Sequence, residues 1–340
     1  MLELREKPDV SQSPVQARAS MQLEAVPCCM CGQYDAVPVA VGEDFEYHTS
    51  QETFLALRCK RCDVIYLSPR PTADSLPCIY PANYHAFNFS AARFGFAYKA
   101  RSWIDKRRVL EAAHGLGETA RILDVGCGDG FHLRLLRKYG RPGWRLEGVD
   151  ADPRAVAAAR NSGLDVHLGD VHEIDLPLSS YDLILLIMTV EHLADPLDTL
   201  RRIRELLRPG GRLLLITDNT STLHFKVFGR RHWGGFHFPR HWNLFDPSSL
   251  RALIARADLE PDDATTLISP VNWVYSIRNL LVDWKAPGWL VRRFSLTSSV
   301  SLGVFTVVDA FWMMLGRGSI LRVIAHRPRA TFDPDYLPQL

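Results

Sequence analysis

The sequence has little excess charge of either sign and no long uncharged apolar stretch. Its 340 residues carry a formal net charge of +2, and 23% of them are charged, so the overall charge gives no reason to expect a nucleic-acid partner. The nearest candidate for a membrane span, residues 300–315, is shorter than the roughly 20 uncharged residues required and carries Asp309. With 47% apolar residues, we expect a globular protein without a transmembrane segment.

A secretory signal is also lacking. Residues 1–25 mix Glu, Lys, Ser, Gln and Pro without the basic start and apolar core of a signal peptide. They show no hydrophobic periodicity, and we expect a flexible tail. The missing signal favours a cytoplasmic, thiol-reducing setting, in which disulfides are a poor explanation for seven cysteines.

Four of the cysteines form two Cys-x-x-Cys pairs. They are Cys28, Cys31, Cys59 and Cys62. Four thiolates make the closed tetrahedral set of a structural Zn²⁺ site, with no position left open for catalysis. Cys29 could compete as a ligand, and four unrelated reduced cysteines are the alternative. We expect a small zinc ribbon and a linker over residues 26–90.

From residue 121 onward, short apolar strands alternate with amphipathic helices, and no internal repeat is visible. Strands are expected at 122–125, 146–149, 165–168, 183–187, 212–217 and 320–325. Helices are expected at 98–114, from the glycine-rich turn after the first strand to residue 139, and at 153–161, 196–207 and 247–257. This rhythm is typical of a parallel sheet covered on both faces. The predicted fold class is therefore α/β, doubly wound and Rossmann-like, over a main domain of residues 91–340.

The strongest motif is a buried strand that runs into a glycine-rich turn and then a helix. Gly126, Gly128 and Gly130 let a ligand approach the backbone closely. Free N–H groups at the following helix N-terminus can hold a carboxylate, and Asp124 can accept from an ammonium group. Asp150 follows the next strand, where a carboxylate can accept from both ribose hydroxyls. This combination predicts a nucleoside ligand with an amino-acid moiety.

Two rival nucleotide-binding patterns are absent. Phe131 stands where the dinucleotide pattern G-x-G-x-x-G needs its last glycine, which disfavours NAD. No Gly-Lys-Ser/Thr follows the turn, so the P-loop is excluded as well. The alternative for the glycine run taken alone is an ordinary tight turn of an α/β fold.

Residues 121–217 resemble the core of class I S-adenosylmethionine-dependent methyltransferases, which have a seven-stranded sheet. The resemblance rests on the Asp-x-Gly-x-Gly-x-Gly turn, on Asp150, and on the segments 169–171 and 188–192. It implies S-adenosylmethionine as cofactor, with ribose on Asp150, the adenine amino group on Asp170 and Val171 beside the ring. A turn-forming aspartate is the alternative for Asp170. The implied cofactor-binding set is Asp124, Gly126, Cys127, Gly128, Gly130, Asp150, Ala151, Asp170, Val171, Met188 and Thr189.

Residues 232–245, after the fifth expected strand, are rich in histidine and aromatic side chains. Ligands of open α/β sheets bind at the carboxyl ends of the strands, so this segment is predicted to line the acceptor pocket. A histidine with a near-neutral pKa can remove the acceptor's proton. The candidates are His241, His237 and His192. A packed or capping histidine is the alternative for each.

The cysteine module, the run from Tyr66 to Pro71 and the pair Tyr80 and Tyr84 resemble the N-terminal zinc domain of certain sugar methyltransferases. This similarity covers about residues 26–326. It implies a histidine base, with which His241 aligns best. Pro-Arg-His stands here in place of that family's Glu-His pairing.

Residues 220–318 are expected to hold the substrate loop and a cap insertion. Residues 300–315 are apolar nearly all round, which predicts a buried cap helix, with membrane-surface contact as the alternative. Arg292, Arg293 and Arg317 flank this stretch and could face lipid phosphates.

These patterns together predict methyl transfer from S-adenosylmethionine to a small molecule, with a sugar or another secondary metabolite as the favoured class. A lipid-linked acceptor stays open, and the sequence does not give the oligomeric state. One alternative is an RNA methyltransferase with a zinc ribbon, but no basic stripe is present and a nucleic-acid partner is not expected. Another is a non-catalytic, nucleoside-binding partner subunit, against which the intact turn with Asp124 and Asp150 argues.

Overall fold

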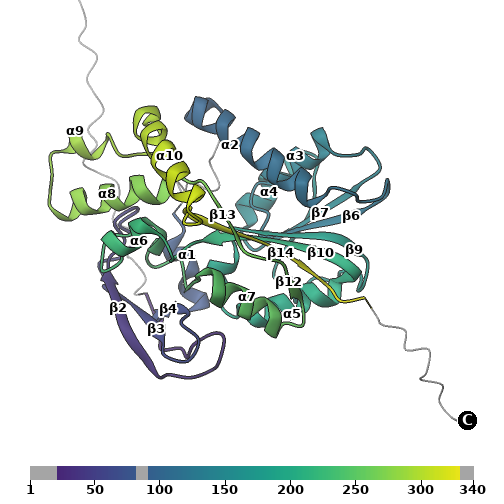
Figure 1. Cartoon of the computed structure of the whole chain (residues 1–340), viewed down its shortest axis with the longest axis horizontal. Helices are drawn as coiled ribbons and strands as arrows, with labels where there is room; N and C mark the ends of the chain where they lie inside the picture. Colours follow the sequence, from purple (N-terminus) through teal and green to yellow (C-terminus); the bar gives the residue numbers. More distant parts are fainter. Residues whose placement is uncertain (1–20, 82–90, 330–340) are drawn as a thin grey trace, which may run out of the picture.

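The computed structural model describes residues 21–81 and 91–329, and its largest element is a mostly parallel sheet (Figure 1). In spatial order its strands are β8 (Asp165–Leu168), β7 (Arg145–Asp150), β6 (Arg121–Val125), β9 (Tyr181–Ile187), β10 (Leu207–Asp218), β14 (Ile320–His326) and, at the edge, β12 (Glu260–Pro261) and β13 (Thr265–Leu267). β14 runs antiparallel to its neighbours on both sides. Because β12 and β13 pair with successive parts of β14, eight strands fill seven positions. The predicted doubly wound α/β fold is confirmed.

Helices cover both faces of this sheet because its strands alternate apolar side chains between the two faces. Leu183 and Leu185 of β9 pack in one core with α2 and α3. Ile184 and Leu186 pack in the opposite core with α5 and α7. The helices on the sheet are α2 (Ala91–Ala112), α3 (Phe131–Tyr139), α4 (Pro153–Asn161), α5 (Pro196–Leu206) and α7 (Pro247–Arg256). All five were predicted, although α2 begins earlier than expected.

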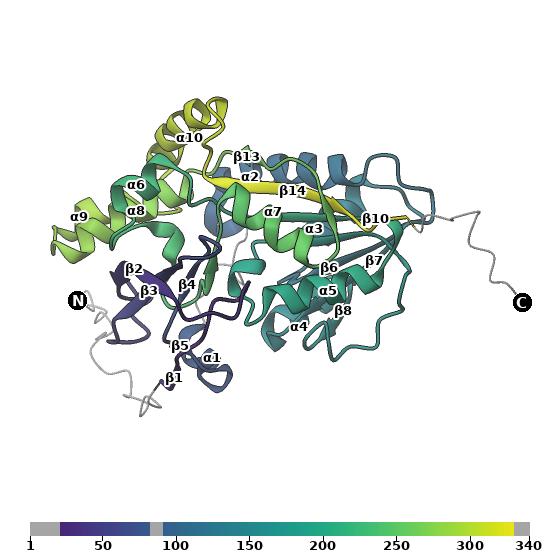
Figure 2. The same cartoon turned by 60° about the horizontal axis from the view of Figure 1, so that its bottom comes forward.

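A second, four-stranded sheet joins the N-terminal residues to the later part of the chain (Figure 2). In spatial order its strands are β11 (Asn243–Leu244), β4 (Ile65–Leu67), β3 (Phe54–Cys59) and β2 (Ala36–Gly42). β11 comes from the segment predicted to line the acceptor pocket. Phe54 and Leu67 share a buried core with Trp233, Phe236 and Trp242 of that segment. The cysteine module is therefore not a free-standing unit, because later residues complete both its sheet and its core.

The N-terminal region differs from the expected organisation in one respect. β1 (Leu23–Glu24) pairs with β5 (Arg70–Pro71), so the expected tail over residues 1–25 gives way to ordered backbone by Leu23. η1 (Ala73–Ser75) and α1 (Leu76–Ile79) follow β5. The rest of the expected tail, Tyr84 and the expected boundary near residue 90 lie outside the described residues.

The insertion between β13 and β14 forms three helices at one end of the molecule (Figure 1). They are α8 (Val271–Asp283), α9 (Gly288–Val291) and α10 (Ser299–Met314), with α6 (Leu223–Phe228) against α8. The expectation of a buried helix over 300–315 is wrong, because α10 contacts α8 and α2 along one side only. In α10 Asp309 is buried, whereas Val300 is 77% exposed. No helix of the described residues is long and apolar enough to cross a membrane.

Candidate active site

Three glycines shape the turn between β6 and α3. Gly126, Gly128 and Gly130 have φ angles of +73°, +55° and +78°, which glycine adopts without strain. A side chain at Gly126 would also collide with Thr189, and one at Gly130 with Leu164. At Gly128 a Cβ would meet no atom within 4 Å. The turn therefore keeps one open side at which a ligand can reach the backbone.

The carboxylate of Asp150 ties this turn to the end of β7. One of its oxygens accepts from the backbone N–H of Gly128 and the other from that of Asp152, both at 2.8 Å. Burial raises the pKa of Asp150, and the two N–H donors act against that rise. Each oxygen keeps a second lone pair, so Asp150 can still accept from the hydroxyl groups of a ligand.

Asp124 is buried near the end of β6, beside a charged histidine. His132 Nδ1 lies 3.7 Å from Asp124 Oδ2, and His132 Nε2 lies 3.8 Å from a carboxylate oxygen of Asp105. Although burial opposes the positive charge, the two carboxylates raise the pKa of His132 to about 9. Asp124 Oδ2 has no hydrogen-bond partner among the described residues. It can accept from a donor group of a ligand.

The other residues predicted to bind the cofactor lie in the turn and just beyond β7, β8 and β9, at the same edge of the sheet. They are Cys127, Ala151, Asp170, Val171, Met188 and Thr189. Met188 has a φ of +51°, a strained conformation that clusters at functional sites. Asp170 accepts from the backbone N–H of His172 at 2.9 Å, so it does form a local turn. Cys127 is buried and lies against Gly148.

The structure brings together the three histidines predicted as catalytic candidates. His192 ends η3 (Val190–His192), just after β9, and His237 and His241 follow η4 (Gly234–Phe236). The ring centroid of His241 lies 4.6 Å from that of His192 and 5.0 Å from that of His237. Two segments far apart in sequence thus form one histidine cluster beside the strand ends.

Hydrogen bonds and burial define the protonation state of these rings. Nδ1 of His241 donates to the carbonyl of Gly235 at 2.8 Å, and Nδ1 of His192 donates to the carbonyl of Arg240 at 3.0 Å. Because a carbonyl only accepts, each Nδ1 carries hydrogen and each Nε2 keeps its lone pair. Burial lowers the pKa of His192 to about 4 and lowers the pKa of His241 well below its ordinary value. Both rings are neutral near pH 7 and able to accept a proton.

Two buried carboxyl groups lie beside the cluster: Glu191, which belongs to the 188–192 segment singled out in the sequence, and Asp218, which the sequence reasoning missed. Asp218 Oδ2 lies 3.5 Å from His241 Nδ1, and Glu191 accepts from the hydroxyl of Thr217 at 2.7 Å. Burial raises the pKa of Asp218 to about 7, and burial together with the nearby Asp218 raises the pKa of Glu191 to about 8. A signal for Asp218 was present, since it directly follows the strand predicted at 212–217, at the ligand-binding edge.

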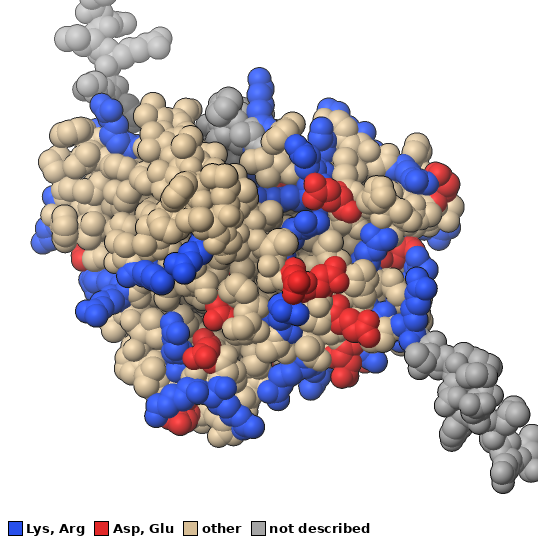
Figure 3. All heavy atoms as spheres, in the orientation of Figure 1, with Lys and Arg blue, Asp and Glu red and all other residues tan. Residues whose placement is uncertain are grey.

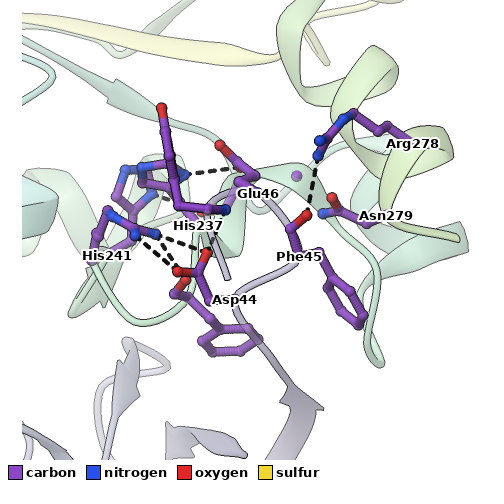
Figure 4. A network of polar contacts seen from close by, with 12 residues as sticks. Asp44, Phe45, Glu46, His237, His241, Arg278 and Asn279 are labelled. Carbon is purple, nitrogen blue, oxygen red and sulfur yellow. Dashed lines mark hydrogen bonds and ion pairs between the residues drawn. The ribbon is translucent and has the colours of Figure 1, made fainter. Parts of the chain in front are cut away.

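The N-terminal module supplies two further acidic residues, which point toward the 237–241 segment in Figure 4. Glu46 Oε1 lies 2.9 Å from His237 Nδ1. Asp44 forms an ion pair with Arg240 at 2.9 Å, and both side chains are fully buried. Burial opposes the charge of Asp44, but Arg240 lowers the pKa of this carboxyl to about 2. The sequence reasoning missed both acids, because their partners lie 191 and 196 positions away along the chain.

The four cysteines predicted as metal ligands meet at one end of the small sheet. Sulfur–sulfur distances are 3.7 Å for Cys28 and Cys62, 3.5 Å for Cys31 and Cys59, and 3.5 Å for Cys59 and Cys62. All four sulfurs lie within 4.8 Å of one another, and Cys29 is not in this group. A tetrahedral Zn²⁺ with bonds of about 2.3 Å separates its sulfurs by about 3.8 Å. The cluster therefore fits zinc in both number and spacing.

A doubly wound sheet whose first strand opens into a three-glycine turn, with a carboxylate at the end of the second strand, defines a nucleoside-binding α/β protein. Residues 96–264 match a family described as methyltransferase domain. The ubiquinone biosynthesis O-methyltransferase of Cereibacter sphaeroides is 34% identical over 178 residues, which cover 48% of this chain and 71% of that protein. That of Ruegeria pomeroyi is 33% identical over 182 residues, 48% of this chain and 71% of that protein.

The fold has a counterpart among solved structures. Phosphoethanolamine N-methyltransferase 2 of Haemonchus contortus superposes with a TM-score of 0.52 at 17% identity, over 86% of this chain and 69% of that one. This likeness concerns the fold alone. The family match and the relatives above 30% identity establish more: the chain belongs to the S-adenosylmethionine-dependent methyltransferases.

Proposed function

We propose that this methyltransferase transfers the methyl group of S-adenosylmethionine to a hydroxyl group of a small organic acceptor. The acceptor would be held between the glycine turn and the histidine cluster. The observation that carries the proposal is the convergence of three histidines, of which His192 and His241 are uncharged, beside the strand ends that flank the turn. The name of the O-methyltransferase relatives supports oxygen as the atom that is methylated. A sugar or another secondary metabolite, including a lipid-linked one, is the class of acceptor to test first.

The turn has room and polar groups for the cofactor. Asp124 Oδ2, which has no hydrogen-bond partner in the described part of the chain, would accept from the ammonium group of S-adenosylmethionine. The open side of Gly128 and the first N–H groups of α3 would receive its carboxylate. Asp150 would accept from the ribose hydroxyls, with Asp170 and Val171 at the adenine. The bound cofactor supplies a methyl group already activated by its sulfonium charge.

His241 is proposed to remove the proton of the acceptor hydroxyl at Nε2. Its Nδ1–H is held by the carbonyl of Gly235, which keeps the Nε2 lone pair free. Asp218, near Nδ1, would stabilise the imidazolium that forms. His192 and His237 lie against the ring and exclude water from it. Positioning supplies much of the rate in methyl transfer, so the base adds to an arrangement that is already favourable.

The four thiolates of Cys28, Cys31, Cys59 and Cys62 are proposed to hold one structural Zn²⁺. Cys28 and Cys59 are buried in the same core as Tyr181 and Phe245 of the catalytic part. The ion would therefore keep the module in place as one wall of the acceptor site. No open coordination position is left for the reaction itself.

Two measurements test the proposal. Calorimetry should detect binding of S-adenosylmethionine. Binding of NAD without binding of S-adenosylmethionine would contradict the proposal. Mass spectrometry should then detect a product heavier by one methyl group when purified protein is incubated with S-adenosylmethionine and a panel of sugar nucleotides, phenols and lipid-linked sugars. Methylation of RNA, with none of the small molecules modified, would contradict the proposed acceptor class.

A further inference from the structure

One face of α10 presents a continuous stripe of apolar side chains to solvent. The stripe consists of Val300, Val304, Val307, Phe311 and Met314. Their spacings of four, three, four and three residues place them on one side of a helix. Each is more than half exposed, from 54% for Phe311 to 77% for Val300. Contiguous exposed apolar patches mark interaction sites on soluble proteins.

Asp309, the one charged residue of α10, is turned toward the protein while the apolar stripe faces solvent, the reverse of an ordinary surface helix. The carboxylate of Asp309, fully buried, accepts from the hydroxyl of Ser319 at 2.6 Å and from the backbone N–H of Ser269 at 2.8 Å. The indole N–H of Trp273 donates to the same carboxylate at 3.2 Å. These bonds fix the rotation of α10 about its axis, so the stripe cannot turn inward without breaking them.

The surroundings of the stripe are basic and aromatic. Between residues 270 and 318 the sequence has five basic residues and only two acidic ones, Asp309 and Asp283. Asp283 is already bound to Arg231 and His232. The exposed cations are Lys285, Arg292, Arg293 and Arg317, and Trp284 and Trp289 are 70% and 60% exposed. Figure 3 shows a broad uncharged surface over α8, α9 and α10, with basic side chains at its margin.

We propose that the α10 stripe, with Trp284, Trp289 and the four exposed cations, binds the surface of a bilayer that contains anionic phospholipid. Apolar side chains would enter the boundary between headgroups and acyl chains, indoles would sit at headgroup depth, and the cations would meet lipid phosphates. A helix of 16 residues is about 24 Å long. It is too short to cross the roughly 30 Å hydrocarbon core and lies in the interface plane.

The charge pattern favours a lipid surface over a second copy of the chain. A symmetric dimer across the stripe would bring Arg292, Arg293 and Lys285 of each copy near the same cations of the other. An anionic membrane neutralises them instead.

α8 joins this surface to the acceptor side of the enzyme. Arg278 of α8 donates to the carbonyl of Phe45 at 3.1 Å (Figure 4). Asn279 of the same helix donates to the carbonyl of His232 at 3.3 Å. Docking would therefore hold the acceptor site close to the bilayer.

Sedimentation of the full chain with vesicles tests the proposal without any methyl acceptor, so the result is independent of the proposed reaction. The wild type should pellet with vesicles of equal parts phosphatidylcholine and phosphatidylglycerol. The double variant Val307→Glu, Phe311→Glu should bind at least about tenfold more weakly, because two charges replace apolar groups that would enter the bilayer. Arg292→Gln with Arg293→Gln should weaken binding about fivefold per residue, and added salt should act in the same direction.

Leu178→Glu is the matched control, since Leu178 is 59% exposed in the connection between β8 and β9. Its binding should equal that of the wild type, and unchanged melting curves should show that every variant is folded. The proposal is overturned if the wild type stays in the supernatant, or if the Val307→Glu, Phe311→Glu variant binds as tightly. It is equally overturned if ultracentrifugation shows a dimer that this variant dissociates while vesicles bind neither protein, which would assign the stripe to a second copy.

Discussion

The cofactor side and the acceptor side of this enzyme are built over very different distances along the chain. Asp150 holds the glycine turn through Gly128, only 22 positions away. On the acceptor side, Asp44 binds Arg240 across 196 positions, and Arg278 binds Phe45 across 233. The first half is a local motif that one βαβ unit completes. The acceptor side forms only after distant segments have folded together. A substitution that unfolds the N-terminal module should therefore disorder the acceptor side and leave cofactor binding nearly unchanged.

The largest loss of stability should come from removing the proposed zinc site. Cys59→Ser with Cys62→Ser should abolish zinc binding and disorder the small sheet, at a cost of at least about 5 kcal/mol of folding free energy, because structural zinc is coupled to folding. Trp233 and Trp242 are buried in the core shared with this module, so tryptophan fluorescence should shift to longer wavelength. Elemental analysis of the wild type should give about one zinc per chain.

The same variant distinguishes the two halves. Calorimetry should show S-adenosylmethionine affinity within about tenfold of the wild type, since the glycine turn contains no residue of the module. Equal loss of cofactor binding would show that the halves are not separable, and a metal-free but fully folded wild type would remove the zinc site altogether.

Breaking the buried ion pair is the next largest effect. Asp44→Asn removes the charge that Asp44 sets against the fully buried guanidinium of Arg240, and we expect a loss of about 3–5 kcal/mol in chemical denaturation. The pKa of Asp44 is lowered to about 2, so its stabilisation is present above the ordinary aspartate pKa of about 4 and is lost as pH falls through 2. Glu43→Gln is the matched control. Its pair with Arg231 is partly exposed, so the loss should stay below about 1 kcal/mol.

The contrast in sequence distance also explains what could be predicted. The sheet, the five helices on it and the glycine turn follow from local periodicity and from residues close together in sequence. The four cysteines were recognised for the same reason, because each pair is a short motif. The three histidines do lie together in the structure, since His192 comes just after β9 and the segment with His237 and His241 follows β10, but their catalytic role stays a prediction.

Long-range partners could not be predicted from local patterns. Asp44 and Glu46 stand in an acidic run that looks like an ordinary solvated loop, and nothing nearby reveals Arg240 or His237. The prediction that α10 is buried was wrong for a related reason. Its composition predicts burial, but exposure depends on which elements reach it. Within the described part of the chain, α8, α2 and the segments at Ser269 and Ser319 contact one side of α10 and leave the stripe exposed.

The third prediction concerns the proposed base. His241→Ala should lower turnover by about 100-fold while S-adenosylmethionine affinity stays unchanged. His237→Ala is expected to be milder. Because burial lowers the pKa of His241 well below its ordinary value, the wild-type ring stays neutral between pH 8 and pH 6.5. Turnover should still fall as the pH drops through about 7, because Asp218, whose pKa burial raises to about 7, then loses the charge that stabilises the imidazolium. Initial rates at saturating cofactor check both statements, and unchanged turnover in His241→Ala would leave this residue a packing role.

The smallest expected change in free energy is that of Asp150→Ala, on the cofactor side. Loss of charge-assisted hydrogen bonds to the ribose should weaken the binding of S-adenosylmethionine by about 1.5–3 kcal/mol, as measured by calorimetry. Asp152→Asn is the control, because Asp152 caps α4 through the N–H groups of Arg154 and Ala155 and does not bond the turn through its side chain. The urea midpoint of Asp150→Ala should move far less than that of Asp44→Asn, since Asp150 is not part of an ion pair with a buried cation. A large drop in stability with unchanged affinity would mean that Asp150 serves the turn and not the ligand.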